Sequence, residues 1–334
     1  MSTTPIIGRQ MQFGIAKEAT RGTAQATADF FLPWSDLSYD DADAKAVDQE
    51  AQGLVEDSLG QTIVKQWSGG TVKGPITDKA FMLFLYSLLG SLSTAADSDA
   101  SGLVKDHTIT VAQTAQPQSL TFFLNDPAAT GDAQDYSFAL GQVQTLEIAY
   151  QQGKFISYSA TLKAKKGVQT NITPATNTEN RFIDKHAVFK LAANLAGLPG
   201  ASAMSIRSFT IKFDRMFDDD MVLGNAGIND QLSKGFVVTG QLDARWDSET
   251  SFKSFALAGT QKALRIDLQN TDVTIGTSAH PGLTIDLAKV MFAAPTRAVK
   301  LGDVVAQTLS FKGHYSTSDS KMVTIKAVNL QTSY

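Results

Sequence analysis

The stretch VQTLEIAY (Val143–Tyr150) alternates apolar and polar residues with a period of two, and FISYSATLKA (Phe155–Ala164) continues the alternation. Such alternation is typical of antiparallel strands with one face in a core and one face exposed. The same pattern recurs in Ser208–Asp214, Phe236–Trp246, Thr308–Tyr315 and Met322–Leu330. The sequence therefore predicts a mainly β protein, with hairpins at Gly141–Lys163 and Gly302–Lys326.

Two helices are expected between the strands. The first runs from Asp78 to Leu89, after Pro75 and before Gly90, with apolar residues at helical spacing. The second runs from Ser248 to Leu257, with Asp247 or Ser248 as its N-cap and Gly259 after its end.

The order of these elements indicates a duplication. Each half holds a glycine-containing strand, a helix, a closing glycine, a strand pair and a hairpin, at positions about 160–170 residues apart, a usual domain size. The expected strand pairs are His107–Val111 with Ser119–Leu124, and Leu264–Leu268 with Leu283–Leu287. We therefore predict two β-sandwich or barrel modules, each with a flanking helix. The predicted boundaries are an N-terminal arm and first strand (1–35), module 1 (36–169), a linker (170–200) and module 2 (201–334).

Composition narrows the classes of function. The 334 residues are 43% hydrophobic, contain no cysteine and carry a net charge of −4. A surface that grips nucleic acid needs an excess of Lys and Arg, which this chain lacks. The most apolar segment, Ala80–Leu92, is far shorter than the ~20 residues that span a bilayer. We recognise no signal peptide at the N-terminus. We therefore expect that the protein does not insert into a membrane and that it assembles in the compartment where it is synthesised.

Two acidic segments are predicted as long loops. Asp36–Leu59 has eight carboxylates against one lysine, and Asp214–Asp230 occupies the matching place in the second half. Long loops in a compact β protein are commonly functional or disordered. Each segment is either a solvated loop or a loop that packs on a neighbouring subunit.

No catalytic or cofactor motif is found. The four histidines (His107, His186, His280 and His314) are isolated, and Asp218–Asp220 lacks the spacing of a calcium loop. No nucleophile-elbow or phosphate-binding loop is present. We predict neither an enzyme nor a cofactor, although a triad assembled from distant segments stays open.

The N-terminal part carries a family resemblance. The run GIAKEATRGTA (Gly14–Ala24), followed by Phe31-Leu32-Pro33, resembles the N-terminus of major tail tube proteins of long, non-contractile-tailed bacteriophages. GGTVKGPI (Gly69–Ile76), with the helix after it and Gly90, is similar as well.

The resemblance implies a structural virion protein whose rings stack into a tube, lined by an antiparallel β-barrel that neighbouring subunits close together. Two modules per chain would make a ring of three chains pseudo-hexameric. The implied partners are further copies of the chain, a tape-measure protein, tail terminator and distal tail proteins, and double-stranded DNA that passes through without specific binding. Synthesis and assembly would occur in the host cytoplasm.

Two sets of residues are predicted to serve this assembly. Asp43, Asp48, Glu50, Glu56, Asp57, Asp218, Asp219 and Asp220 would lie in loops that contact the next ring. Thr145, Glu147, Thr161, Lys163, Thr308, Ser310, Thr324 and Lys326 would lie in hairpins that form the lumen wall. We also hypothesise that the lumen has a negative potential, which would repel DNA phosphates.

Other classes of function remain open on the sequence alone. One is another phage virion β protein, such as a capsid decoration or head–tail completion protein. Another is a soluble carbohydrate-binding β protein, which would need exposed aromatic residues gathered near carboxylates. Trp34, Trp67 and Trp246 are far apart in the sequence, which does not favour that alternative.

Overall fold

A computed structural model describes residues 7–51, 53–114, 116–127, 134–245, 252–299, 301–302 and 304–334. The chain is mainly β, as predicted. Its first half contains β1 (Gln12–Lys17), β2 (Phe30–Leu32), β3 (Asp36–Asp48), β4 (Gly60–Pro75), α1 (Phe81–Leu89), β5 (Gly90–Ala96), β6 (Lys105–Val111), β7 (Leu120–Asn125), β8 (Tyr136–Gln151), β9 (Ser157–Ala164) and β10 (Val168–Gln169).

The second half contains β11 (Ala187–Ala192), β12 (Ala203–Met204), β13 (Ile206–Asp220), β14 (Asp230–Arg245), α2 (Phe252–Leu257), β15 (Lys262–Gln269), β16 (Gly282–Phe292), β17 (Thr296–Ala298), β18 (Ala306–Gly313) and β19 (Val323–Asn329). Three short 3-10 helices, η1 to η3, cover Gly8–Gln10, Asp184–His186 and Leu195–Gly197. Residues 170–180, the first part of the predicted linker, contain neither helix nor strand.

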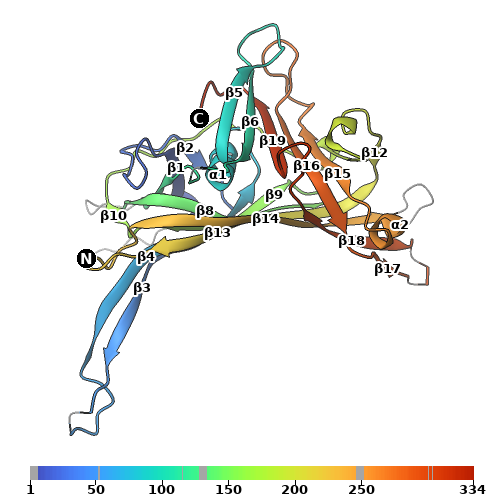
Figure 1. The fold of residues 1–334 in the computed structure, drawn as a ribbon. Helices are drawn as coiled ribbons and strands as arrows, with labels where there is room; N and C mark the ends of the chain where they lie inside the picture. The colour runs from blue at the N-terminus through green and yellow to red at the C-terminus, as the bar shows by residue number, and fades with distance from the viewer. Residues whose placement is uncertain are drawn as a thin grey trace.

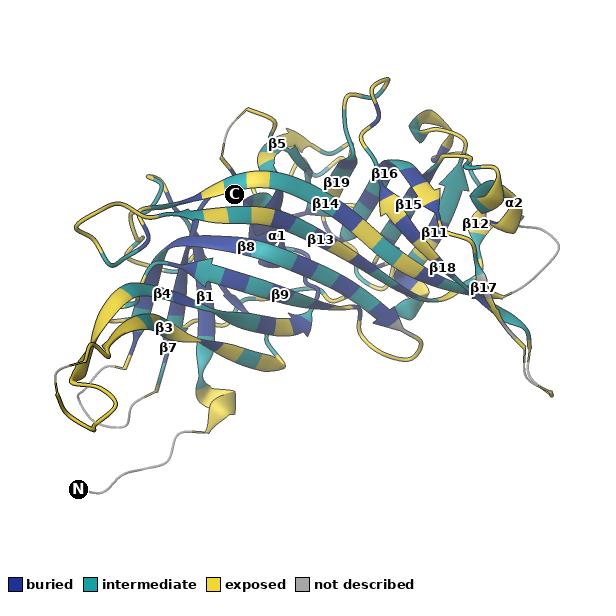
Figure 2. Ribbon diagram, turned by 60° about the horizontal axis from the view of Figure 1, so that its bottom comes forward, coloured by how far each residue is buried: buried dark blue, intermediate teal, exposed yellow. Residues whose placement is uncertain are grey.

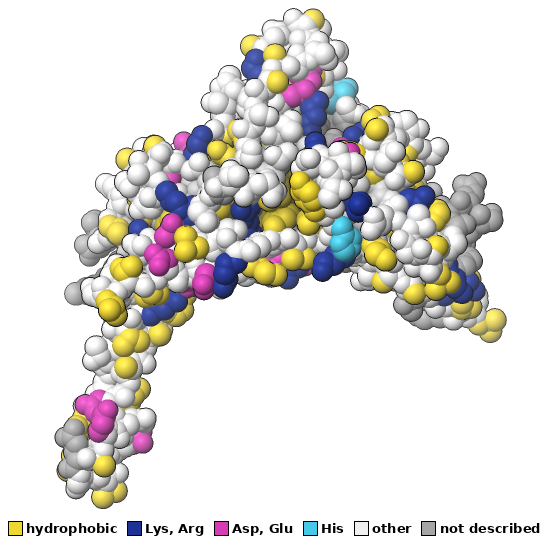
Figure 3. All heavy atoms as spheres, viewed as in Figure 1, with side chains coloured by type: hydrophobic (Ala, Val, Ile, Leu, Met, Phe, Trp, Pro, Cys, Tyr) yellow, Lys and Arg dark blue, Asp and Glu magenta, His cyan; other side chains and the backbone are white. Residues whose placement is uncertain are grey.

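One long antiparallel sheet runs through both halves. Its strand order is β3-β4-β9-β8-β13-β14-β18, and β8 pairs with β13 where the halves meet. Figure 1 shows this sheet along the lower side of the molecule, and Figure 2 shows its lower face, which no other helix or strand of the described residues covers. Because this face is hollowed in outline in Figure 3, we call the seven strands the concave sheet.

Two further groups of strands cover the upper face. One has the order β2-β1-β7 and continues to the N-terminal part of β8 and β10. The other has the order β12-β11-β15-β16-β19-β6-β5, so β19 of the second half pairs with β6 of the first. Buried residues from both halves form one hydrophobic cluster between these layers and the concave sheet.

Helix α1 lies in this interior, and all its residues except Tyr86 are buried. The ring of Phe81 lies 5.1 Å from that of Tyr158 on β9, which holds the helix against the concave sheet. Gly90 ends the helix with φ of +92°, a left-handed conformation that glycine adopts without steric cost. The predicted first helix is therefore confirmed, although its first regular residue is Phe81.

Both ends of α1 are capped by residues from beyond the first half. The Glu179 carboxylate accepts the N–H groups of Lys79 and Ala80 at the N-terminus of the helix. The Arg215 guanidinium, on β13, donates to the carbonyl oxygens of Leu88 and Leu89 at 3.0 and 3.1 Å. An anion at the N-terminus and a cation at the C-terminus both favour the helix dipole.

The order of long hairpin, helix and strand recurs in the second half. β3, β4 and α1 begin at residues 36, 60 and 81, and β13, β14 and α2 begin at 206, 230 and 252, an offset of 170 or 171 residues. Unlike α1, α2 lies at one end of the molecule and buries only Phe252 (Figure 1). The predicted start of this helix, Asp247 and Ser248, lies outside the described residues.

Two predicted pairings are confirmed, and two are wrong. β8 pairs with β9, and β15 with β16, as expected. However, β6 pairs with β5 and β19, whereas β7 pairs with β1 and β8. β18 pairs with β14 and β16, whereas β19 pairs with β16 and β6, so Gly302–Lys326 is not a hairpin. In both cases the two strands of the predicted pair join different groups of strands. Local alternation does not encode which group a strand joins.

Candidate assembly surfaces

The lower face of the concave sheet presents rows of polar side chains. Residues directly opposite each other on paired strands share a face, so the strand register defines the rows. One row crosses the sheet as Asp36, Lys73, Ser159, Glu147, Lys212, Thr239 and Lys312. The neighbouring rows are Ser38, Thr71, Thr161, Thr145, Asp214 and Val237; Ser157, Ala149, Thr210, Gln241 and Ser310; and Ser208, Asp243 and Thr308.

These rows are rich in hydroxyl groups and nearly balanced in charge. They hold the four carboxylates of Asp36, Glu147, Asp214 and Asp243 against the three lysines Lys73, Lys212 and Lys312. Asp243 accepts hydrogen bonds from Ser208 and Thr308 at 2.6 and 2.7 Å, and Lys73 lies 2.7 Å from Asp36. These rows therefore carry a net charge of −1, and the negative potential of the lumen stays a hypothesis.

Six of the predicted lumen-wall residues gather on this sheet. Thr145 and Glu147 lie on β8, Thr161 and Lys163 on β9, and Thr308 and Ser310 on β18. The hydroxyl groups of Thr145 and Thr161 are hydrogen-bonded at 2.9 Å across their strands. Figure 2 shows buried and less buried residues alternating along β8, β9, β13 and β14, as expected for a half-buried sheet.

Thr324 and Lys326 do not belong to this face, so their prediction needs correction. Both lie on β19, in the layer above, where β16 and β6 flank the strand. The Lys326 ammonium is 2.7 Å from Asp106 of β6. The error has the same cause as the missing hairpin, because β19 turns into the upper layer instead of returning along β18.

The first acidic segment is a strand for half of its length, not a loop. Asp36–Asp48 forms β3, which pairs with β4 over its whole length, so Asp43 lies within the strand and Asp48 at its end. Glu50, Glu56 and Asp57 lie in the connection at the tip. Figures 1 and 3 show this hairpin standing away from the body of the protein.

The second acidic segment is also mostly strand, because only residues 221–229 connect β13 to β14. Asp218, Asp219 and Asp220 are the last residues of β13. Asp219 accepts the ammonium groups of Lys65 and Lys163 at 2.6 and 2.7 Å, and its side chain is only 13% exposed. Burial opposes ionisation of Asp219, but the two lysines outweigh it and lower the carboxyl pKa.

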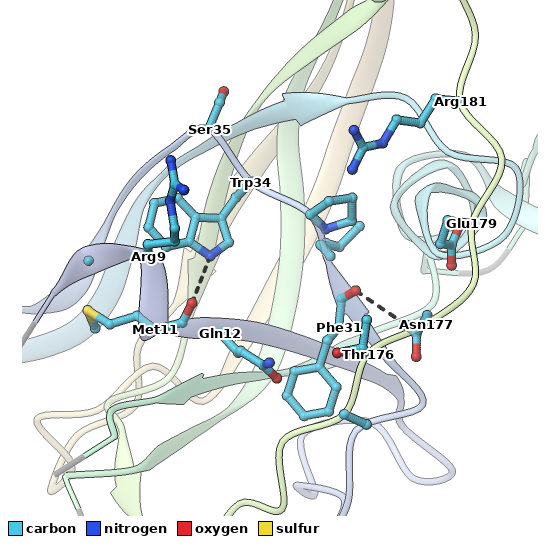
Figure 4. Close-up of a pocket in the computed structure, with 14 residues that line it drawn as sticks. Arg9, Met11, Gln12, Phe31, Trp34, Ser35, Thr176, Asn177, Glu179 and Arg181 are labelled. Atoms are coloured by element: carbon cyan, nitrogen blue, oxygen red, sulfur yellow. Dashed lines mark hydrogen bonds between the residues drawn. The ribbon is translucent and has the colours of Figure 1, made fainter. Parts of the chain in front are cut away.

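A groove of about 670 Å³ lies where the N-terminal segment meets β2 and the segment around Glu179 (Figure 4). The Trp34 indole donates to the carbonyl of Met11 at 3.2 Å, and the Asn177 side chain donates to that of Phe31. Arg9 and Arg181 line the groove beside apolar groups. Glu179, which also lines the groove, accepts the N–H groups of Lys79 and Ala80 at the start of α1.

Comparison with known proteins identifies the family. A sequence model of the phage tail tube protein family matches residues 8–313, which is most of the chain. The chain belongs to the phage tail tube protein family. A search of curated proteins found no match.

Membership in a structural family indicates a non-enzymatic role, and it implies that this tail tube protein is a virion component that self-assembles with other tail proteins. Across the described residues, no group of three His, Cys, Asp or Glu side chains could hold a metal ion. The buried His107 instead hydrogen-bonds to Thr94 and Asn329.

Two remaining features of the tail tube protein bear on the open alternatives. Trp34 packs against the core, and Trp67 contacts the ammonium groups of Lys65 and Lys163, so these two rings do not form a shared aromatic surface. Trp246 lies outside the described residues. No helix in the described part of the chain is long and apolar enough to cross a membrane.

Proposed function

We propose that three copies of this chain close into a ring whose lumen is lined by the concave sheet, and that such rings stack into the tail tube of a long, non-contractile phage tail. The observation that carries this proposal is the polar, uncovered face of a single sheet to which both halves contribute strands. A barrel of many strands encloses an aqueous channel, and its interior is polar. The two halves act as two tail-tube modules, so the ring is pseudo-hexameric.

One edge of the sheet, at β3, supports closure between copies, whereas β16 and β17 already pair with the outer side of β18. Within the described residues, the 13-residue β3 pairs with β4 on one side and with no strand on the other. An open edge of this length is a template for pairing with another chain. A neighbouring copy that covers this edge removes the exposed backbone groups and continues the sheet around the ring.

The balanced charge of the face fits transient passage of DNA. A basic wall would bind phosphates strongly through counterion release. Here lysines stand among carboxylates and hydroxyl groups, so DNA would meet little net charge. In this proposal the near balance of charge, together with any repulsion from a slightly negative lumen, lets DNA pass without binding.

The proposed roles of the other tail proteins and of DNA follow from the assembly of this chain into a tube. A tape-measure protein occupies the lumen during assembly, tail terminator and distal tail proteins cap the ends, and DNA leaves through the lumen. Assembly takes place in the host cytoplasm before the tail joins the virion. A capsid decoration or head–tail completion role is the alternative within virion proteins, and the family match favours the tube.

Native mass spectrometry and negative-stain electron microscopy of the purified chain test the proposal. We expect species of three chains and ring-shaped or tubular particles. Rings of six chains would contradict the two-module ring but keep the tube. A chain that stays monomeric at high concentration, in conditions that favour burial of apolar surface, would contradict the proposed assembly.

A further inference from the structure

The two halves of the chain begin with the same order of elements. A 3-10 helix, two strands and a long hairpin follow one another as η1, β1, β2 and β3–β4, and again as η2, β11, β12 and β13–β14. In each half an extended isoleucine, Ile7 or Ile183, stands directly before the 3-10 helix. Each hairpin has a bulge that leaves one residue of its second strand unpaired, Val64 or Lys234, and these two residues are 170 positions apart. The two halves can therefore be compared position by position.

The start of the second half receives a turn from the first half. In the turn between β8 and β9, Phe155 lies directly opposite Ile183 in an antiparallel pair. The Gly153 N–H of the same turn donates to the Asp184 carboxylate of η2 at 3.4 Å. Just before the turn, β8 pairs with the first part of β13. The turn thus lies between η2 and the start of β13.

The matching place in the first half is the groove shown in Figure 4. It is lined by Gly8 and Arg9 of η1 and by Trp34 and Ser35, which stand just ahead of β3. Its volume of about 670 Å³ is that of an ordinary binding site, ~300–1,000 Å³. Gln12 also lines the groove, and its Oε1 atom is buried without a hydrogen-bond partner among the described residues. A buried acceptor of this kind indicates that a partner is missing.

The equivalent of the β8–β9 turn is the turn between β17 and β18. β9 begins opposite Pro75 of β4, and β18 begins opposite Arg245 of β14, 170 positions later. Phe155 and Val304 each stand two residues before these strands. Val304 is therefore the equivalent of Phe155, as Ile7 is the equivalent of Ile183.

The β17–β18 turn has apolar side chains to bury. Val299, Leu301 and Val304 are each at least 64% exposed, and Ile7 beside the groove is 63% exposed. Exposed apolar groups gathered in this way mark a surface that binds another protein. Figure 1 shows β17 at one end of the molecule and β1 and β2, which border the groove, at the other. The turn and the groove of one chain thus face different neighbours.

We propose that the groove is the docking site for the β17–β18 turn of a second copy of this chain, the neighbour in the same ring. The inference rests on the proposed ring and names the surfaces that join its copies. Val304 of the second copy lies opposite Ile7, as Phe155 lies opposite Ile183 within one chain. The same neighbour brings its β17, which pairs with β18 on one side, alongside β3. This β17 takes the place that β8 takes beside β13.

The junction in the middle of the chain is thus repeated between copies. Because groove and turn are different surfaces, the contact is heterologous and closes only through rotation into a ring. A ring of three chains has six such junctions, three within chains and three between them. Burial of the turn against Met11, Phe31 and Pro33 of the groove stabilises each junction between chains.

Disulfide cross-linking tests the predicted pair, because the chain contains no cysteine. A chain with Ile7→Cys, mixed with a chain with Val304→Cys and oxidised, is expected to give at least tenfold more covalent dimer than either chain alone. Residues directly opposite each other on antiparallel strands lie ~4.5–5.5 Å apart, which permits a disulfide. A chain with both substitutions is expected to give covalent trimers that close on themselves.

Two controls accompany the cross-link. Phe155→Cys with Ile183→Cys in one chain should give a disulfide within that chain, which verifies the geometry of the junction used as the template. Ile7→Cys mixed with Leu223→Cys should give little covalent dimer, although Leu223 is fully exposed at the tip of the β13–β14 hairpin.

A second experiment measures the strength of the contact. Leu301→Asp with Val304→Asp is expected to raise the dissociation constant of the three-chain ring at least tenfold, since a few apolar residues dominate an interface. Leu223→Asp is the matched control on another exposed tip. Sedimentation of the purified chains measures assembly, and thermal unfolding verifies that both variants fold.

The outcomes separate this inference from the proposed function. Wild-type rings without the Ile7–Val304 cross-link, alongside an efficient control within the chain, would overturn the docking and leave the ring standing. A disulfide between Ile7→Cys and Val304→Cys of the same chain, or equal weakening by Leu223→Asp, would overturn the docking as well. A wild-type chain that forms no rings would instead remove the proposed function, and this inference with it.

Discussion

The carboxylate of Glu18 accepts the backbone N–H of Leu140 at 2.7 Å in the interior of the protein. It also accepts the Gly22 N–H at 2.7 Å and the Ser119 hydroxyl at 2.5 Å. Leu140 has φ of +56°, which is unfavourable for a residue with a side chain. Glu18 therefore stabilises a strained point of β8, where this strand passes from one group of strands into the concave sheet.

Replacement of Glu18 by Ala is expected to destabilise the chain strongly. Three donors would lose their acceptor, the buried groups of Leu140 and Ser119 and the partly buried N–H of Gly22, and each unsatisfied buried group costs about 1–3 kcal/mol. We therefore expect the free energy of unfolding to fall by about 3 kcal/mol or more. Denaturant unfolding of the unassembled chain measures this loss. Glu50→Ala, on the exposed tip, is the control, and equal stability of the two variants would contradict the role of Glu18.

The fold could be predicted from the sequence where a strand is half-buried and its partner is the next strand along the chain. β8 and β9 fulfil both conditions, so their hairpin follows from alternation and proximity. β3 does not, because both faces of its outer part meet solvent and no alternation results. Its Asp and Ala residues also have low strand propensity, so pairing with β4 decides its conformation.

The assembly surfaces could be predicted only in part, because alternation gives the exposed face of a strand but not the layer it joins. Thr308 and Lys326 have similar local patterns, yet their strands lie in different layers. Arg215 was missed, although the sequence holds a signal for it. It continues the buried positions Phe209, Ile211 and Phe213 at intervals of two, which places a cation on the core face.

Gly70→Ala is expected to disrupt the base of the β3–β4 hairpin. A Cβ atom at this position would lie 1.8 Å from the carbonyl oxygen of Ser38, which belongs to the paired strand β3. Since backbone cannot move aside without breaking the ladder, the variant should unfold at lower temperature and expose β3 to proteolysis. Gly60→Ala on the same strand is the matched control, because nothing lies within 4 Å of its Cβ position. Equal melting temperatures and protease resistance would contradict the clash.

Arg215→Met is expected to weaken the junction of the two halves. Burial lowers the pKa of Arg215 to about 10, so the guanidinium is costly to bury and depends on its hydrogen bonds to α1. The variant leaves two helix carbonyls without this donor, and we expect a loss of about 1–3 kcal/mol in the free energy of unfolding. Lys212→Met, on the exposed face of the same strand, should change it by less than about 0.5 kcal/mol. Denaturant unfolding of both variants measures these changes. Similar losses in the free energy of unfolding would argue against the capping role of Arg215.

The carboxyl groups at the start of α1 should make stability depend on pH. Burial, together with the charge of Asp78, raises the pKa of Glu179 above its ordinary value of 4.5. Burial likewise raises the pKa of Asp78. A raised carboxyl pKa means that the folded chain binds more protons than the unfolded chain. Burial and the charge of Asp78 thus outweigh the favourable hydrogen bonds of the ionised Glu179 to the helix N-terminus. The contribution of Glu179 to the free energy of unfolding is fully present below pH 4.5 and is lost as the pH rises through the folded pKa.

Comparison of wild type with Glu179→Gln isolates this effect, because the buried His107, whose pKa is lowered, opposes it in both proteins. We expect the unfolding free energy of wild type, relative to the variant, to increase as the pH falls from 7 to 4.5. Asp272→Asn gives the opposite control, since Lys185 and His186 lower the pKa of Asp272. Its stabilisation is present above pH 3.8 and is lost only below it. Urea unfolding across this range measures both differences, and a Glu179 difference that is constant or shrinks toward pH 4.5 would contradict the raised pKa.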